Sequence, residues 1–145
     1  MSQGSKEASR RKASLILIVL QGNDADGDIV SLACAVAGER GAELRGLYVV
    51  EIPRSQPLAS WNEKAEEEAR AVLERARREA GRLGCRFEGR VLPSRDAGQA
   101  IVDESVEISA DLVVISKPFR SKRGDAALHV LDRALCTVLV WRPRR

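Results

Sequence analysis

Residues 111–141 read DLVVISKPFRSKRGDAALHVLDRALCTVLVW, a pattern that indicates a strand, a loop, a helix and a second strand. The uniformly apolar runs at 111–115 and 137–141 predict the strands. Between them we expect a basic loop at 117–123 and a short helix over about 125–135. Strands that are apolar on both faces are typical of a parallel sheet with helices on both sides.

The rest of the chain repeats this alternation of apolar strands and amphipathic helices. Further strands are predicted at 14–20, 42–50 and 85–92, with helices over 24–41, over 60–83 and from Asp96 onward. An alternating chain of this kind predicts an α/β fold with right-handed crossovers. We therefore expect a single flavodoxin-like or Rossmann-like three-layer sandwich.

Length and composition set the domain organisation. The 145 residues, of which 44% are hydrophobic, suit one compact domain. We predict a disordered basic arm at 1–13, an α/β domain at 14–142 and a tail at 143–145. The apolar run Leu15–Leu20 is too short for a membrane span and is followed by acidic residues rather than by a cleavage site, so we expect neither a membrane segment nor a signal peptide.

Charge and cysteine content exclude several classes of function. The net charge of +3 and the 3% of aromatic residues do not favour nucleic-acid binding, because base stacking needs aromatic side chains. Cys34, Cys85 and Cys136 are far apart in the sequence, which indicates reduced, buried thiols, a cytoplasmic location and no metal site. His129 is the only histidine, and no nucleophile–base pair can be assembled, so we predict no catalytic residues and no enzyme activity.

Two helix starts carry capping signals. Ser60-Trp61-Asn62-Glu63 has the spacing of a capping box, which predicts that Ser60 caps the longest helix. Asp24, Asp26 and Asp28 crowd the start of the first helix, and we expect one of them to cap it. Their alternation is similar to a calcium loop, but the glycine and the bidentate glutamate of such a loop are missing.

Three segments of the chain together resemble the universal stress protein family. They are the first strand and turn at 15–23, the strand at 110–115, and above all 130–140, a short helix that leads into a Val-Leu-Val strand. The resemblance implies a five-stranded parallel sheet in the order 3-2-1-4-5 between helices, and a protein that is usually dimeric. Many members of this family bind ATP, and others do not.

The nucleotide-binding positions of the family differ here. Gln21 stands where ATP-binding members carry an aspartate against the adenine, and Ser116 and Phe119 replace two glycines. Only four residues separate Phe119 from Gly124, and Asp125 replaces a hydroxyl residue. Backbone amides hold phosphates only where no Cβ blocks the approach, and a carboxylate at a helix start repels them. We therefore predict no cofactor and no binding of ATP in the family manner.

Basic residues follow the predicted carboxyl ends of the strands, where ligands bind in open parallel sheets. Converging cations of this kind hold an anion without a glycine loop, although a solvated basic rim is the alternative. The predicted ligand-binding residues of this crevice are Gln21, Gly22, Asn23, Arg95, Ser116, Lys117, Arg120, Arg123 and Gly124.

The last strand is expected to mediate self-association. In the strand order that the resemblance implies, it lies at the edge of the sheet, and an apolar edge strand pairs readily with a second copy. The predicted homodimer interface consists of Thr137, Val138, Leu139, Val140 and Trp141.

These patterns predict a non-enzymatic universal stress-like protein with a regulatory role in the stress response, exerted through partner or anion binding. One alternative is a stress protein that binds ATP or AMP with a remodelled phosphate loop. Another is a weak contact with nucleic acid through Arg10-Arg11-Lys12 and the basic edge.

Overall fold

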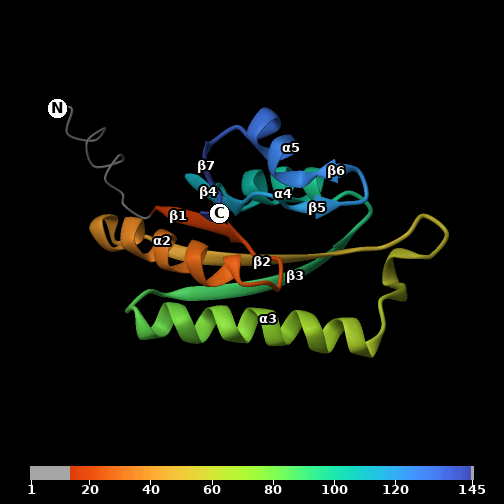
Figure 1. Ribbon diagram of the computed structural model, residues 1–145, viewed down its shortest axis with the longest axis horizontal. Helices are drawn as coiled ribbons and strands as arrows, with labels where there is room; N and C mark the ends of the chain where they lie inside the picture. Colours follow the sequence, from red (N-terminus) through yellow and green to blue (C-terminus); the bar gives the residue numbers. More distant parts are fainter. Residues whose placement is uncertain (1–13, 145) are drawn as a thin grey trace.

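The computed structural model describes residues 14–144, and within them a five-stranded parallel sheet has the strand order β3-β2-β1-β4-β7 (Figure 1). The strands are β1 (Leu15–Val19), β2 (Glu43–Glu51), β3 (Phe87–Ser94), β4 (Leu112–Ser116) and β7 (Thr137–Trp141). The helices are α2 (Ala25–Arg40), α3 (Glu63–Arg82), α4 (Ala97–Glu107) and α5 (Ala126–Arg133). The predicted fold class and strand order are confirmed. The predicted arm at 1–13 and the last residue of the predicted tail lie outside the described residues.

Strand β1 lies at the centre of the sheet and supplies both layers of the core. Ile16 and Ile18 pack into the cluster beneath α2 and α3, while Leu17 and Val19 pack into the cluster beneath α4 and α5. All four side chains are at most 2% exposed. This alternation follows from the two-residue period of a strand, and it explains why the sequence is apolar at every position.

The start of α3 corrects the predicted cap. Asn62, not Ser60, is the N-cap, and its Oδ1 accepts a hydrogen bond from the backbone N–H of Ala65 at 2.8 Å. Ser60 belongs to a short 3₁₀ helix, η1 (Leu58–Ser60), and Trp61 is extended between the two helices. Because η1 ends at Ser60, this side chain does not reach the first turn of α3, and its hydroxyl donates to Gln56 instead.

The segment predicted as a basic loop contains a small antiparallel hairpin. It is formed by β5 (Arg120–Ser121) and β6 (Gly124–Asp125), with Arg120 opposite Asp125. The following helix α5 ends at Arg133, two residues earlier than predicted, because Ala134 is extended and leads into β7. Among the described residues, no helix has the length and apolar character needed to cross a bilayer.

Candidate functional site

The polar residues after β1 and β4 meet at the point where the strand order reverses. From β1 the chain proceeds outward to β2 and β3 on one side, and β4 and β7 complete the other side. The loops that follow β1 and β4 therefore diverge at the carboxyl edge of the sheet, which is the usual ligand position in such folds. The structure brings Gln21 and Ser116 together at this point, with Lys117 following directly after Ser116.

Gln21 closes this crevice with its side chain. Its Nε2 donates to the Ser116 hydroxyl at 2.7 Å and to the carbonyl oxygen of Pro118 at 3.1 Å. Ser116 is 1% exposed, so the first of these bonds ends on a buried residue. Two loops that are 95 residues apart in the sequence are thus joined by hydrogen bonds across the switch point.

The carboxylate of Asp26 accepts hydrogen bonds from backbone amides of the loop after β1. Its two carboxylate oxygens accept from the N–H groups of Gln21 and Gly22, each at 2.8 Å. Burial raises the pKa of this carboxyl, although the backbone donors and the positive charge of Arg75 act in the opposite direction. The expected aspartate cap of α2 is therefore wrong in its geometry. Asp24 holds the N-cap position without a side-chain bond, and Asp26 reaches back into the loop.

Asp125 occupies the corresponding amides of the loop after β4. Its Oδ1 accepts from the N–H of Phe119 at 3.1 Å and from the N–H of Ala127, in the first turn of α5, at 2.9 Å. The ammonium group of Lys117 lies 3.7 Å from the other oxygen, Oδ2. The carboxylate thus stands in an anion position made of two backbone donors and a lysine.

Glu51, at the end of β2, makes a third arrangement of this kind. Its carboxylate accepts from the N–H of Ala97, the first residue of α4, at 3.0 Å and from the N–H of Lys122 in the hairpin at 2.9 Å. Asp96 caps α4 through the N–H of Gln99. Internal carboxylates therefore bind backbone donors of the loops after β1, β3 and β4.

The basic residues of the edge either form ion pairs with Asp96 and Asp125 or lie away from Gln21. Arg123 Nε is 3.5 Å from the carboxylate of Asp96, and Arg95 donates to the carbonyl oxygen of Pro53 at 2.7 Å. Arg95 and Arg123 line two separate hollows beside α4, and Arg120 is exposed on the hairpin. Gly124 lies opposite Ser121 in the same hairpin. The predicted basic residues thus do not converge on Gln21.

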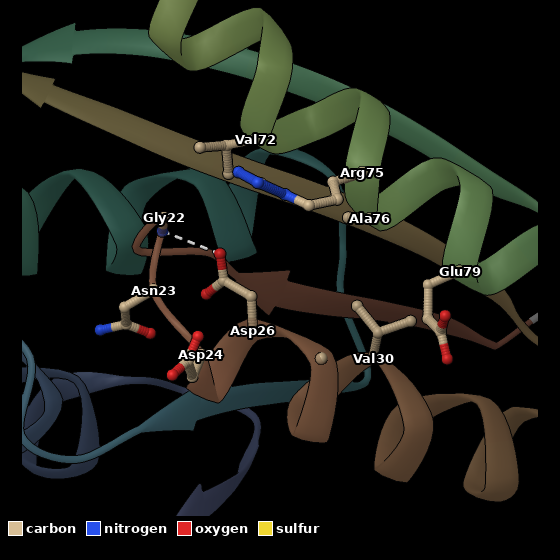
Figure 2. A pocket seen from close by; sticks show the side chains of 10 residues that line it. Gly22, Asn23, Asp24, Asp26, Val30, Val72, Arg75, Ala76 and Glu79 are labelled. Atoms are coloured by element: carbon tan, nitrogen blue, oxygen red, sulfur yellow. Dashed lines mark hydrogen bonds between the residues drawn. The ribbon is translucent and has the colours of Figure 1, made fainter.

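A cavity of about 330 Å³ lies between the loop after β1 and the helices α2 and α3. Figure 2 shows Arg75 and Glu79 on α3 facing Asp26 and Val30 on α2. The backbone of Gly22 has φ +82°, which favours glycine, and a Cβ there would lie 3.2 Å from Val72. The cavity is lined by Gly22, Asn23, Asp24, Asp26, Gly27, Val30, Val72, Arg75, Ala76 and Glu79.

The contribution of α3 to this cavity could not be predicted from the sequence. Arg75 and Glu79 are four residues apart and lie on a charge-rich helix, a pattern that is equally typical of a solvated face. Only the packing of α3 beside α2 distinguishes these two residues from their charged neighbours. Within residues 14–144, no group of three or more potential ligands could hold a metal ion. His129 is hydrogen-bonded through Nε2 to Gln99 Oε1 at 2.9 Å.

Comparison with known sequences identifies the fold family. The sequence model of the universal stress protein family matches residues 13–142. The chain belongs to the universal stress protein family. A comparison of this universal stress family chain with curated proteins gave no match.

Solved structures similar to this universal stress family chain have the same fold. A universal stress protein from Archaeoglobus fulgidus in complex with dAMP is 20% identical, with a TM-score of 0.73 over 88% of this chain and 95% of its own. A family member from Burkholderia pseudomallei is 24% identical, with a TM-score of 0.68 over 89% and 96%. One from Arabidopsis thaliana, with AMP bound, is 12% identical, with a TM-score of 0.67 over 90% and 92%.

Proposed function

We propose that this chain is a non-enzymatic member of the universal stress protein family that does not bind ATP in the family manner. Its regulatory role in the stress response would depend on a protein partner or a small anion. The cytoplasm is the predicted compartment. The observation that carries this proposal is the position of Asp125, whose carboxylate accepts from two backbone amides and lies beside Lys117.

A phosphate that entered this position would have to displace the Asp125 carboxylate. The bonds of an internal carboxylate to backbone donors involve no loss of ligand translational freedom, whereas a free nucleotide loses that freedom on binding. An incoming phosphate would also meet the negative charge of Asp125 at short range. The bond from Gln21 to Ser116 at 2.7 Å closes the crevice from the other side.

Isothermal titration of the full chain with magnesium and ATP tests this proposal. We expect no saturable heat for the native chain. Asp125→Ser is the informative variant, because serine also caps helices well while it removes the negative charge. We expect this variant to gain weak binding of ATP or inorganic phosphate. A tight, stoichiometric complex of the native chain with ATP would contradict the proposal.

Any small ligand of the basic edge is proposed to be an anion that contacts Arg95, Lys117, Arg120 or Arg123. Because Lys117 and Arg123 lie beside carboxylates, such an anion competes with Asp125 and Asp96 and binds weakly. Chemical-shift mapping with sulfate tests this, with the double variant Arg120→Ala/Arg123→Ala as the comparison. Unchanged affinity in this variant, or shifts at the opposite edge of the sheet, would argue against the basic edge.

Nucleotide binding in a remodelled site is the second candidate, favoured by the cavity of about 330 Å³ against Gly22. The solved relatives with dAMP and AMP make nucleotides the natural ligands to test. Titration with AMP of the native chain and of Arg75→Ala distinguishes this candidate from the main proposal. Saturable AMP binding that Arg75→Ala weakens would favour the remodelled site.

We also propose that the chain forms a homodimer through β7. This strand is at one edge of the sheet, and its predicted interface residues are Thr137, Val138, Leu139, Val140 and Trp141. The carbonyl oxygen of Trp141 accepts from the N–H of Lys117, so the backbone groups of Trp141 point toward β4. Because backbone groups alternate along a strand, Val138 and Val140 direct theirs outward, where a second β7 would pair antiparallel.

Val140→Pro tests the dimer, because it removes one outward donor while it leaves the donors to β4 in place. We expect light scattering to show a dimer for the native chain and a monomer for this variant. Circular dichroism would verify that the variant is folded. A native chain that stays monomeric at high concentration would exclude the dimer.

A further inference from the structure

Two cysteines from different elements lie together beneath α2 and α3. Cys34 is on α2 and is 6% exposed, and Cys85 is on the connection between α3 and β3 and is partly buried. Both side chains belong to the hydrophobic cluster on this face of the sheet, where Cys85 lies near enough to Cys34 to contribute to the raised pKa of its thiol. The backbone N–H of Cys85 donates to the carbonyl oxygen of Ala80 at 2.8 Å, which fixes the connection against the end of α3.

The surroundings of the two thiols differ. Burial raises the pKa of Cys34 to about 12, and the neighbouring Cys85 and the negative charge of Glu79 act in the same direction. Cys34 therefore remains a thiol at neutral pH. Cys85 is the more accessible sulfur, so an oxidant from solution meets it first.

The two cysteines and the cavity of Figure 2 all lie against α2 and α3. Val30, which lines the cavity, is one helical turn before Cys34 on α2. Glu79, which also lines the cavity, is close enough to Cys34 to influence its thiol. A covalent bond between Cys34 and Cys85 would therefore tie α2 to the end of α3 beside the cavity.

We propose that Cys34 and Cys85 are a redox-convertible dithiol that hydroperoxides oxidise to an intramolecular disulfide. The Cys85 thiolate attacks one peroxide oxygen, the O–O bond breaks, and the hydroxide that leaves is protonated to water. The sulfur of Cys34 then attacks the Cys85 sulfenic acid, the S–O bond breaks, and a second water leaves with the Cys34 proton. The two thiols lose two electrons and two protons in total, and one hydrogen peroxide is reduced to two waters.

The test is to expose the full folded chain to hydrogen peroxide, alkylate the remaining thiols and analyse the product by peptide mass spectrometry. We expect the mass of the chain to fall by two hydrogen atoms. The peptides that contain Cys34 and Cys85 should be linked, and Cys136 should be found alkylated. The reaction should become faster as pH rises, because the thiolate is the nucleophile.

Matched variants separate this pair from the third cysteine. Cys136→Ser should leave the linkage unchanged, whereas Cys85→Ser and Cys34→Ala should each abolish it, with circular dichroism verifying that both remain folded. Oxidation should also raise the thermal midpoint of the native chain by several degrees and leave that of Cys85→Ser unchanged, because a cross-link restricts the unfolded chain. A linkage that involves Cys136, or oxidation of Cys85 to sulfinic acid while Cys34 stays alkylated, would overturn the proposal.

Discussion

Asp26 and Asp125 perform the same task at the two loops of the switch point, but under different electrostatic conditions. Each carboxylate accepts from two backbone N–H groups, Asp26 in the loop after β1 and Asp125 in the loop after β4. Asp125 also has the ammonium group of Lys117 at 3.7 Å and is 19% exposed. For Asp26, burial raises the pKa of the carboxyl in spite of its backbone donors and the charge of Arg75.

The backbone donors and the charge of Arg75 together do not fully compensate the Asp26 carboxylate for its loss of water. Two amide bonds stabilise the charged form of Asp26, but desolvation is the larger effect. Asp125 also accepts two backbone hydrogen bonds, and in addition forms an ion pair with Lys117. We therefore expect the loop after β4 to depend more strongly on its carboxylate than the loop after β1.

The largest effect is expected for Asp125→Ala. This change removes the cap of α5, the partner of the Phe119 amide and the partner of Lys117, and should lower the free energy of unfolding by about 2 kcal/mol. Urea denaturation measures the loss. Asp132→Ala, at an exposed position near the C-terminal end of α5, is the matched control and should be close to neutral. Equal losses in the two variants would contradict the role assigned to Asp125.

Loss of an ordinary helix cap should lower the free energy of unfolding by an intermediate amount. Asn62→Ala at the start of α3 removes one side-chain bond to the Ala65 amide and should cost about 1 kcal/mol. Ser60→Ala should change the free energy of unfolding by less than about 0.5 kcal/mol, because Ser60 lies outside α3. A larger loss from Ser60→Ala than from Asn62→Ala would restore Ser60 as the effective cap.

Asp26→Ala should cost less at neutral pH than Asp125→Ala, under about 1 kcal/mol, because relief of desolvation offsets the two lost hydrogen bonds. The loss should grow as pH falls. The pKa of Asp26 is raised in the folded chain above its ordinary value of 3.8, so the folded chain takes up the proton first. The resulting stabilisation of the native chain is complete below pH 3.8 and disappears as pH rises through the folded-state pKa.

Urea denaturation of the native chain and of Asp26→Ala, repeated from neutral pH to about pH 4, measures this change. Asp132→Ala serves again as the control for general acid effects. A difference between the native chain and Asp26→Ala that shrinks on acidification would show that the hydrogen bonds outweigh desolvation.

The sheet could be predicted from the sequence because its signals are local. Uniformly apolar runs specify β1, β4 and β7, and Gly41 ends α2 in the left-handed conformation that favours glycine. The resemblance to the universal stress family supplied the strand order. The cap of α3 was predicted at Ser60 and lies at Asn62, in the same four-residue segment. Asn62 is as good a capping residue as Ser60, so the sequence alone does not distinguish them.

Which side chains meet at the carboxyl edge of the sheet could be predicted only in part. Gln21 and Ser116 were both expected at the crevice, but their direct bond depends on side-chain geometry across two strands in parallel register. The acidic residues that follow the strands are few in the sequence, and their partners could not be predicted from it. In the folded chain Glu51, Asp96 and Asp125 accept from backbone amides, and Asp96 and Asp125 also pair with Arg123 and Lys117. Such pairings join distant residues, and no periodicity reveals them.

The central position of β1 has a consequence for synthesis of the chain on the ribosome. β1 pairs with β2 in the register Ile16–Leu44, and its other edge pairs with β4 in the register Ile16–Leu112. The second edge therefore stays without its partner until almost a hundred more residues have been translated. An unpaired apolar strand edge associates readily with other chains. Until β4 is translated, this edge of β1 is therefore open to association with other chains.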